Sequence, residues 1–531
     1  MIGGARMLLS RRSVFTLVVL AVFATALWVA SRRLSDQCPG GPYCPDFSRI
    51  SSNVSPPGDV SKTGKETKEK ETAEQPAEDT SSTEHPDTTE SNDGGSTITI
   101  VPENEETKND DTINTDHVPI KAAQSPCANF PDTSDVLLIM KTGASEAYSK
   151  VPTQIMTNLQ CLPEYYIFSD MEQHIAGHKI YDSLDDVLQD VKTNNKDFDL
   201  YLRQKACTLD LQLCQVGYDL GAEGWALDKY KFVHVAEKTY KMRPDYKWYL
   251  FVEADTYVVW SNIMEWLKRL DHTKPLYLGS VAMLNNEPFG HGGSGYIMSH
   301  AAMHDMFEGK TRVANTYDKN ATQTCCGDAL FAAAVKNETG VKIQHTYPAI
   351  NGDKPHTIPY SEDLWCHPIA TMHHVSPQDV NDLATFERER GFSGPLRIKD
   401  IYKRFIQPHM VPHRDDWDNF SDDELYLNSS SRKYDKGELD RAKTKDLTPL
   451  EESAHESFEA CQKLCESLDH CFQYRFHNGI CFIGKKIRHG EPKKPTKIAD
   501  KQYKSGWNMD KITQWVEAHE HCDGVKWPEV K

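Results

Sequence analysis

The sequence lacks an excess of basic residues. It contains 60 lysines and arginines against 78 aspartates and glutamates, and the formal net charge is -18. Proteins that bind DNA or RNA need basic patches to neutralise phosphates, so this composition argues against a nucleic-acid partner. The chain also has no internal repeat, and its 531 residues predict more than one domain once the tails are set aside.

Aromatic and large apolar residues are scarce between about Ser35 and Ser125. The stretch is rich in Glu, Thr, Ser, Lys, Asp and Pro, and the part from Lys62 to Asn92 is almost free of large apolar residues. Such a segment cannot bury enough apolar surface to offset the entropy lost on ordering. We therefore expect residues 32–125 to form a disordered stem.

One uncharged apolar run, from Val14 to Ala30, precedes this stem. With the serines on either side it is just long enough to cross a bilayer as a helix. The flanking arginines slightly favour a cytosolic N-terminus; they are Arg6, Arg11, Arg12, Arg32 and Arg33. The pattern predicts a cytosolic tail (1–13) and a single-pass, type II signal anchor (14–31). A cleaved signal peptide is the alternative, disfavoured by the length of the run and the absence of a clear cleavage site.

Cysteines and glycosylation triplets fit a lumenal chain. There are 14 cysteines, enough for a disulfide framework in a secretory protein. Asn-x-Ser/Thr triplets begin at Asn53, Asn320, Asn337, Asn419 and Asn428. Cys38 and Cys44 bracket a Pro/Gly turn near the apolar run, and they pair either with each other or with a second chain. A homodimer therefore stays open.

Short apolar runs alternate with helical patterns after Asp135. The runs at 136–140, 165–168 and 248–252 are typical of strands buried on both faces of a parallel sheet. Helical patterns lie at 184–191 and 226–242. This alternation predicts an α/β domain over residues 126–410. A charged linker is expected over 411–450, followed by a small cysteine-rich module over 451–531.

Two acids end the third of these strands. Glu253 and Asp255 follow the apolar run, and ligands of open α/β sheets bind at the carboxyl ends of strands. Two carboxylates at this edge would suit Mg²⁺ or Mn²⁺, which can hold a diphosphate leaving group. The alternative is a pair of solvated turn residues. The next helix is expected to begin near Ser261 or Asn262, with Glu265 at a capping offset from Asn262.

A glycine-rich loop and a first-turn acid follow along the chain. Gly292, Gly293 and Gly295 allow close backbone approach, although a simple tight turn explains them equally well. They lack GxGxxG spacing, which argues against a dinucleotide-binding fold. Asp328 starts an Ala-rich helical stretch. It is either a helix-capping acid or a general base that takes a proton from a hydroxyl group.

Adjacent histidines, His373 and His374, supply candidate metal nitrogens. In a strand their side chains would face opposite ways, so only one of them is expected to reach a metal. The alternative is a hydrogen-bonded structural histidine.

The order of these motifs resembles glycosyltransferase family 31, the fringe and core 1 β1,3-galactosyltransferase group, and most closely its fungal branch. The resemblance spans about 135–380 and rests on MKTG at 140–143, EADTY at 253–257, GGSGY at 292–296, GDALF at 327–331 and MHHV at 372–375. It implies a GT-A fold, a UDP-sugar donor, Mn²⁺, and transfer with inversion, commonly β1,3, to a glycan or glycoprotein. It also implies a Golgi membrane enzyme with a lumenal catalytic domain.

The resemblance also implies roles for individual residues. Asp255 would be a direct metal ligand, His373 a second ligand and Asp328 the catalytic base. Glu253 would support the metal or the nucleotide. Gly292, Gly293 and Gly295 would line the sugar site. Two departures stand out: the acid triplet reads Glu-Ala-Asp, and Gly327 replaces the acid that precedes the base.

Four cysteines at 461, 465, 471 and 481 define the C-terminal module. They allow three disulfide connectivities, and a structural zinc site is disfavoured because a second CxxC is missing. With FQY at 472–474 and SGW at 505–507 the module resembles a PAN/apple domain. That resemblance implies the pairs Cys465–Cys471 and Cys461–Cys481, and it implies binding of carbohydrate or protein. A stabilising appendage is the alternative, and Cys522 has no evident local partner.

Two other function classes stay open at this level. The first is a membrane-anchored, lectin-like binding protein whose transferase domain has lost activity. The second is a glycoside hydrolase, which would need two acids that flank the scissile bond. The sequence does not identify such a pair.

Overall fold

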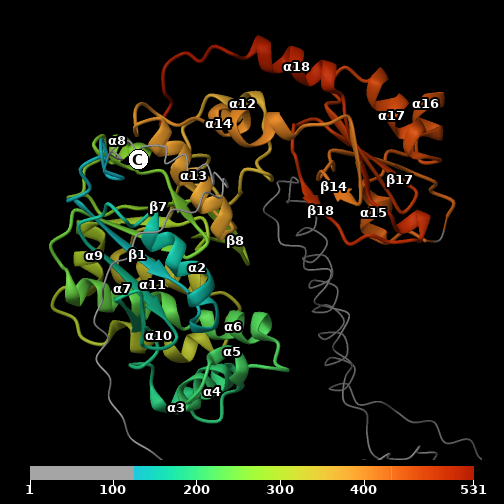
Figure 1. Ribbon diagram of the computed structural model, residues 1–531. Helices are drawn as coiled ribbons and strands as arrows, with labels where there is room; N and C mark the ends of the chain where they lie inside the picture. Colours follow the sequence, from blue (N-terminus) through green and yellow to red (C-terminus); the bar gives the residue numbers. More distant parts are fainter. Residues whose placement is uncertain (1–124, 432) are drawn as a thin grey trace, which may run out of the picture. The chain divides into compact units, whose positions relative to one another are not determined.

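The computed structural model of the protein describes residues 125–531 apart from Arg432 (Figure 1). The predicted tail, membrane anchor and stem, except Ser125, lie outside the described residues, as do Cys38, Cys44 and Asn53. Within the described part, no helix is long and apolar enough to cross a bilayer.

An eight-stranded mixed sheet forms the centre of the α/β part, in the order β11-β7-β10-β5-β1-β2-β4-β3. β1 pairs in parallel with both β2 and β5, whereas β10 is antiparallel to β5 and β7. The strands are β1 (Val136–Lys141), β2 (Tyr165–Ser169), β3 (Gln173–Ile175), β4 (His178–Asp182), β5 (Trp248–Glu253), β7 (Tyr277–Gly279), β10 (Tyr296–Ser299) and β11 (Gln344–His345). The three strands predicted from the apolar runs are confirmed.

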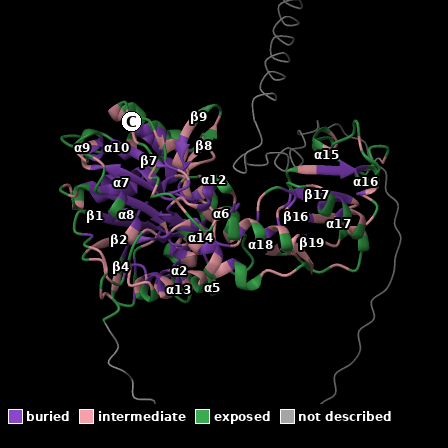
Figure 2. Cartoon of the chain, turned by 90° about the horizontal axis from the view of Figure 1, so that it is seen from above, coloured by how far each residue is buried: buried purple, intermediate pink, exposed green. Residues whose placement is uncertain are grey.

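Helices cover both faces of this sheet. Alternate residues of β1 explain the two layers, since Leu137 and Ile139 enter one apolar cluster while Leu138 and Met140 enter the other. The first face is covered by α7 (Lys231–Met242), α9 (His300–Phe307), α10 (Val313–Ala321) and α11 (Gly327–Thr339). The second is covered by α2 (Ala144–Met156) and α8 (Trp260–Leu267). Figure 2 shows the central strands buried between these layers.

The expected helices are only partly correct. Over 184–191 the chain forms turns, and only α3 (Gln189–Lys192) is helical. The apolar spacing arises because Leu184 and Val187 pack from turns into a small cluster with Phe198. Residues 226–242, which were expected to form one helix, belong to two helices, α6 (Leu220–Asp228) and α7.

The helix after the acid pair also begins earlier than expected. α8 starts at Trp260, with Val259 at its N-cap. Asn262 is not a cap, because its Nδ2 donates to the carbonyl oxygens of Ile369 and Leu396, each at 2.7 Å.

The C-terminal module contains a five-stranded antiparallel sheet in the order β13-β19-β16-β17-β15. Its strands are β13 (His413–Asp415), β15 (Glu424–Leu427), β16 (Gln473–His477), β17 (Ile480–Gly484) and β19 (Lys504–Trp507). The prediction of a plain linker over 411–450 is therefore wrong, because β13 and β15 are the edge strands of this sheet. The segment looks polar because β13 is polar and mostly exposed and because β15 adds only a short apolar run, in which Leu425 and Leu427 pack against Ile480 and Phe482.

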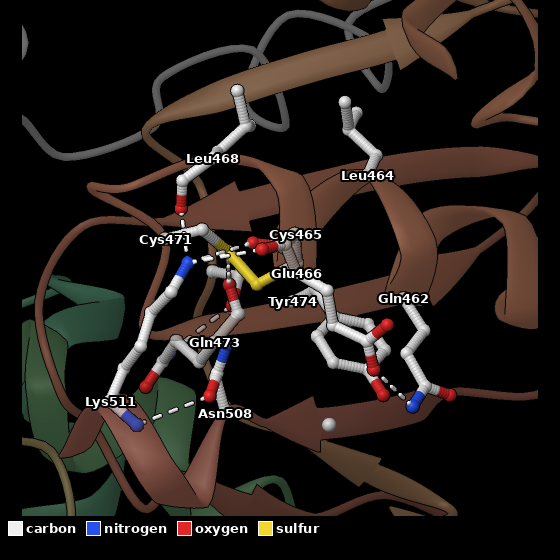
Figure 3. Close-up of a disulfide and its surroundings, with 12 residues drawn as sticks. Gln462, Leu464, Cys465, Glu466, Leu468, Cys471, Gln473, Tyr474, Asn508 and Lys511 are labelled. Atoms are coloured by element: carbon white, nitrogen blue, oxygen red, sulfur yellow. Dashed lines mark hydrogen bonds between the residues drawn. A yellow bond between two sulfur atoms is a disulfide. The ribbon is translucent and has the colours of Figure 1, made fainter.

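Two disulfides staple the module, and both have the connectivity that the resemblance implied. Cys461 pairs with Cys481, and Cys465 pairs with Cys471. Figure 3 shows the second bridge at the end of α17 (Phe458–Ser467), where the ammonium group of Lys511 donates to the carbonyl oxygen of Leu468 at 2.5 Å. A cation there stabilises the carbonyl groups left unpaired at a helix end.

Four further disulfides account for the other described cysteines: Cys127–Cys161, Cys207–Cys214, Cys325–Cys326 and Cys366–Cys522. Cys522 therefore finds its partner in the α/β part, at a sequence separation of 156 residues. The glycosylation triplet at Asn419 is not a usable acceptor in the folded chain. Its side chain is fully buried and donates to the carbonyl oxygens of Tyr474 and Gly506.

Candidate functional site

Charged residues gather at the carboxyl ends of β1 and β5. The strand register sets Lys141 opposite Glu253, and the Lys141 ammonium lies 3.0 Å from the Glu253 carboxylate and 2.7 Å from that of Asp228. Burial alone would lower the pKa of Lys141, but the two carboxylates raise it above its usual value. β1 has β2 on one side and β5 on the other. From β2 the sheet extends in one direction, and from β5 it extends in the other. Open α/β sheets bind ligands at such a reversal of strand order.

A second, two-stranded sheet brings His373 to the acids. β6 (Tyr257–Val258) pairs with β12 (Thr371–Met372), so the residue after β12 lies beside the residues before β6. His373 Nε2 is 3.2 Å from Asp255 Oδ1 and 3.6 Å from Glu253 Oε2. Burial would lower the pKa of His373, but its hydrogen bonds to the two carboxylates raise it to about 9.

His374 lies beside the same cluster, although the alternation of side chains in a strand predicts that it faces away from His373. β12 ends at Met372, and His374 adopts a left-handed backbone with φ of 59°. The alternation of side chains along a strand therefore does not apply to this pair. The two imidazole rings lie 3.8 Å apart, and ligand atoms of Asp255, His373 and His374 lie within 4.8 Å of one another.

The donor atoms suit a divalent cation. Two ligands held at about 2.1 Å from one ion at a right angle are about 3 Å apart, close to the 3.2 Å between His373 Nε2 and Asp255 Oδ1. The Lys150 ammonium lies 3.2 Å from the other oxygen of Asp255 and leaves Oδ1 for the cation. One carboxylate and two imidazoles form a mixed oxygen and nitrogen set that can hold Mn²⁺. Binding would displace the proton that His373 otherwise carries.

The glycine-rich loop passes directly beneath this cluster. It joins β9 (Glu287–Gly290) to β10 and is held by Thr256, whose hydroxyl donates to the Gly293 carbonyl at 2.7 Å. A Cβ atom at Gly293 would lie 2.1 Å from His373 Cε1, so only glycine fits beneath the imidazole. Gly295 has φ of +84°, the region that glycine favours. The glycines are thus needed for close packing as well as for the turn.

Asp328 lies on the other side of the same loop. It is in the first turn of α11, where one carboxylate oxygen accepts the Gly292 N–H at 3.0 Å and the other accepts the Ala329 N–H at 2.8 Å. The N-cap position belongs to Cys326. Burial raises the pKa of Asp328 to about 6 against the lowering effect of these two hydrogen bonds. The structure therefore places this acid in the first turn of a helix and also in contact with the site loop.

Three residues of the site had no role assigned from the sequence. Lys141 belongs to the MKTG motif, but its ion pairs depend on strand register and on α6. Asp228 carries no local signal, because its importance comes from where α6 ends. His291 lies in the glycine-rich loop with its ring 5.7 Å from that of His373, and burial, together with the nearby His373, lowers its pKa to about 4.

Comparisons with known proteins add little to this picture. No profile of a known protein family matches the chain, and no curated protein matches it. Among solved structures, one match is the galactosyltransferase LgtC, solved in complex with donor and acceptor sugar analogs. It is 12% identical, and the alignment covers 48% of this chain and 100% of that chain with a TM-score of 0.22. A similarity this weak does not establish a shared fold, so the functional argument rests on the site itself.

Proposed function

We propose that the protein is an inverting, metal-dependent glycosyltransferase of the GT-A type. It would move a hexose or N-acetylhexosamine from a UDP-sugar to a hydroxyl group of a glycan or glycoprotein, with β1,3 as the linkage that the motif resemblance implies. One observation carries this proposal. A candidate metal cluster (Asp255, His373 and His374) and an acid of raised pKa (Asp328) lie on either side of one glycine-rich loop at the carboxyl edge of the sheet.

The roles follow from the chemistry of each side chain. Asp255 and His373 would hold Mn²⁺, which when bound supplies positive charge for the departing diphosphate. Lys141 fixes the Glu253 carboxylate beside His373. Asp328 accepts the proton of the acceptor hydroxyl, whose oxygen bonds to the anomeric carbon as the bond from that carbon to UDP breaks. A base with a pKa near 6 is well suited to this transfer at neutral pH.

Packing accounts for the two departures from the family pattern. Ala254 is buried, and its N–H donates to the Lys141 carbonyl at 3.0 Å, so an acid there would lose solvation. A Cβ atom at Gly327 would lie 2.5 Å from the Phe232 ring, which leaves no room for an acid before Asp328. Both departures fit the local packing without removing Asp255 or Asp328 from the site.

We also propose a lumenal, Golgi setting, with the chain anchored by residues 14–31. Six disulfides among the described residues favour an oxidising compartment. The C-terminal module, which resembles a PAN/apple domain, would bind the acceptor or a partner protein.

The test is metal-dependent release of UDP. The chain from about Leu34 onward, made in a secretory host, is incubated with a panel of UDP-sugars in Mn²⁺ or in chelator. We expect release from one donor, its loss in chelator and in Asp255→Ala, and its retention in Asp135→Ala. Asp135 is a matched acid, exposed and paired with Lys247 at the opposite edge of the sheet. Absence of both UDP release and Mn²⁺-dependent UDP binding would overturn the proposal and favour a lectin-like binding protein.

A further inference from the structure

Exposed apolar side chains gather on the segment from α4 (Asp199–Ala206) to α6. Six large apolar residues there are 51% to 77% exposed: Leu202, Leu209, Leu213, Val216, Tyr218 and Trp225. Only five other large hydrophobic residues are comparably exposed in the described chain, and they are scattered along it. We call these six residues the α4–α6 platform. Exposed apolar patches of this kind mark surfaces that bind a partner.

The platform is fixed in place by covalent and ionic contacts. The Cys207–Cys214 disulfide closes the loop that carries Leu209 and holds α5 (Leu211–Cys214) against it. Arg203 lies 3.7 Å above the Tyr218 ring, donates to Gln215 at 3.1 Å and forms an ion pair with Glu223. A preorganised surface loses little entropy when it binds, so this arrangement favours recognition.

One helix, α6, links the platform to the proposed catalytic edge. Trp225 lies one helical turn before Asp228, the residue that contacts Lys141. The next residue, Lys229, has its Cα 2.7 Å from where a Cβ of Gly327 would be, and Gly327 directly precedes Asp328. α6 therefore leads from the apolar surface to the proposed base.

The composition of the platform indicates what it binds. Four of its six members are aliphatic, which suits apolar side chains better than the polar edges of a sugar. Over 199–228 the sequence has five acids and two bases, and both bases are paired, Arg203 with Glu223 and Lys205 with Asp182. Asp228 is paired with Lys141, so three acids have no ion pair among the described residues: Asp199, Asp210 and Asp219. This excess of acids would be repelled by anionic lipid and by a second copy of the same segment, and it would attract basic groups.

We propose that the α4–α6 platform docks the polypeptide part of the acceptor, a segment whose apolar and basic side chains flank the hydroxyl that receives the sugar. The inference rests on the proposed function, because it names the substrate class of that site. The platform would act as a docking surface outside the reacting centre and would set acceptor affinity while the catalytic residues set the rate.

The test measures binding without requiring turnover. Two labelled 20-residue peptides serve as probes, one built of Leu, Phe and Lys with Gly spacers, the other with Ser in place of Leu and Phe. We expect the first to bind and the second to bind weakly. Trp225→Ser and Leu213→Ser should each reduce affinity for the first peptide about tenfold, the scale of an aromatic or apolar anchor. Leu450→Ser, an exposed residue of the C-terminal module, should leave it unchanged.

Three results would overturn the docking proposal. The first is equal affinity of wild type and platform variants for the apolar peptide. The second is platform-dependent binding to phosphatidylcholine vesicles in place of the peptide, and the third is a concentration-dependent dimer that Trp225→Ser dissociates. Donor hydrolysis without acceptor should be the same in Trp225→Ser as in wild type. UDP release and peptide binding are separate readouts, so failure of one proposal is distinguished from failure of the other.

Discussion

The α/β part and the C-terminal module both bury polar and charged residues, but they arrange them differently. In the module the two buried carboxylates, Asp418 and Glu451, lie apart, Asp418 paired with Arg475 and Glu451 with Lys443. Neutral groups such as Gln473, whose Nε2 donates to the Asn419 carbonyl at 2.7 Å, are buried among them. At the edge of the large sheet the charged groups are clustered, as with Lys141, Glu253 and His373. Charged groups are costly to desolvate, and clusters with shifted pKa values are typical of functional sites.

The two parts also differ in what holds them together. The α/β part has two apolar clusters, one on each face of its sheet, and can accommodate a charged edge. The module is smaller, and its four central cysteines are completely buried in its core. Small domains depend on such staples because they bury less apolar surface. We therefore expect the chemistry to take place in the α/β part and the disulfides to stabilise the C-terminal module. Four predictions test this contrast.

The largest effect is expected from Asp328→Asn. The amide keeps the shape but cannot accept the proton, so turnover should fall by about 10²-fold to 10⁴-fold. In the wild type, kcat should fall as the pH drops below about 6, because the carboxylate becomes protonated and only its ionised form is a base. Steady-state rates from pH 5 to 8 check both points. Mn²⁺-dependent UDP binding should persist in the variant, and unchanged turnover would refute the base assignment.

Gly293→Ala should disrupt the candidate metal cluster without replacing any of its residues. The new methyl group would lie 2.1 Å from His373 Cε1, so the imidazole must move away from Asp255. We expect Mn²⁺ affinity to fall about tenfold to 100-fold, as for other changes that misorient a ligand. Calorimetric titration with Mn²⁺ measures this loss. Gly224→Ala is the matched control, because no atom lies within 4 Å of its Cβ position in α6, and it should leave affinity intact.

Removing the Cys461–Cys481 bridge should affect stability more than chemistry. The loop it closes spans 20 residues, for which the chain-entropy account gives about 3 kcal/mol. The double variant Cys461→Ser, Cys481→Ser should unfold at a lower temperature in calorimetry and release UDP from the donor at the normal rate below that temperature. Loss of donor turnover in the folded double variant would show that the module takes part in the chemistry.

Glu387→Gln should stabilise the α/β part at high pH. Burial raises the pKa of Glu387 to about 7 even though it accepts a 2.5 Å hydrogen bond from Tyr257. Its folded pKa exceeds the unfolded value, so its contribution to stability is present at low pH and is lost as the pH rises through about 7. Removing the buried charge should raise the free energy of unfolding by at most about 3 kcal/mol at pH 8. Thermal unfolding at pH 8 and pH 5 tests this, and equal gains at both would contradict it.

Much of the architecture was predictable from local pattern. The runs that became β1, β2 and β5 are apolar throughout because both faces of these strands are buried, and composition alone indicates that. The prediction missed β13 because its residues are polar and mostly exposed, and it missed β15 because the three apolar residues of that strand form a very short run within a polar stretch. The break between α6 and α7 was missed because apolar spacing continues across it.

For the site, the sequence determined which residue types were available: two acids after a buried strand, a glycine-rich loop, an acid at a helix start and adjacent histidines. Only the tertiary structure decided how they meet. The pairing of β6 with β12 brings His373 to Asp255, and a ligand atom of His374, whose backbone is left-handed, lies within 4.8 Å of both. The end of α6 supplies Asp228 to Lys141. These contacts join residues about 90 to 120 positions apart, and no local periodicity encodes such distances, because they depend on strand register and on how whole elements pack.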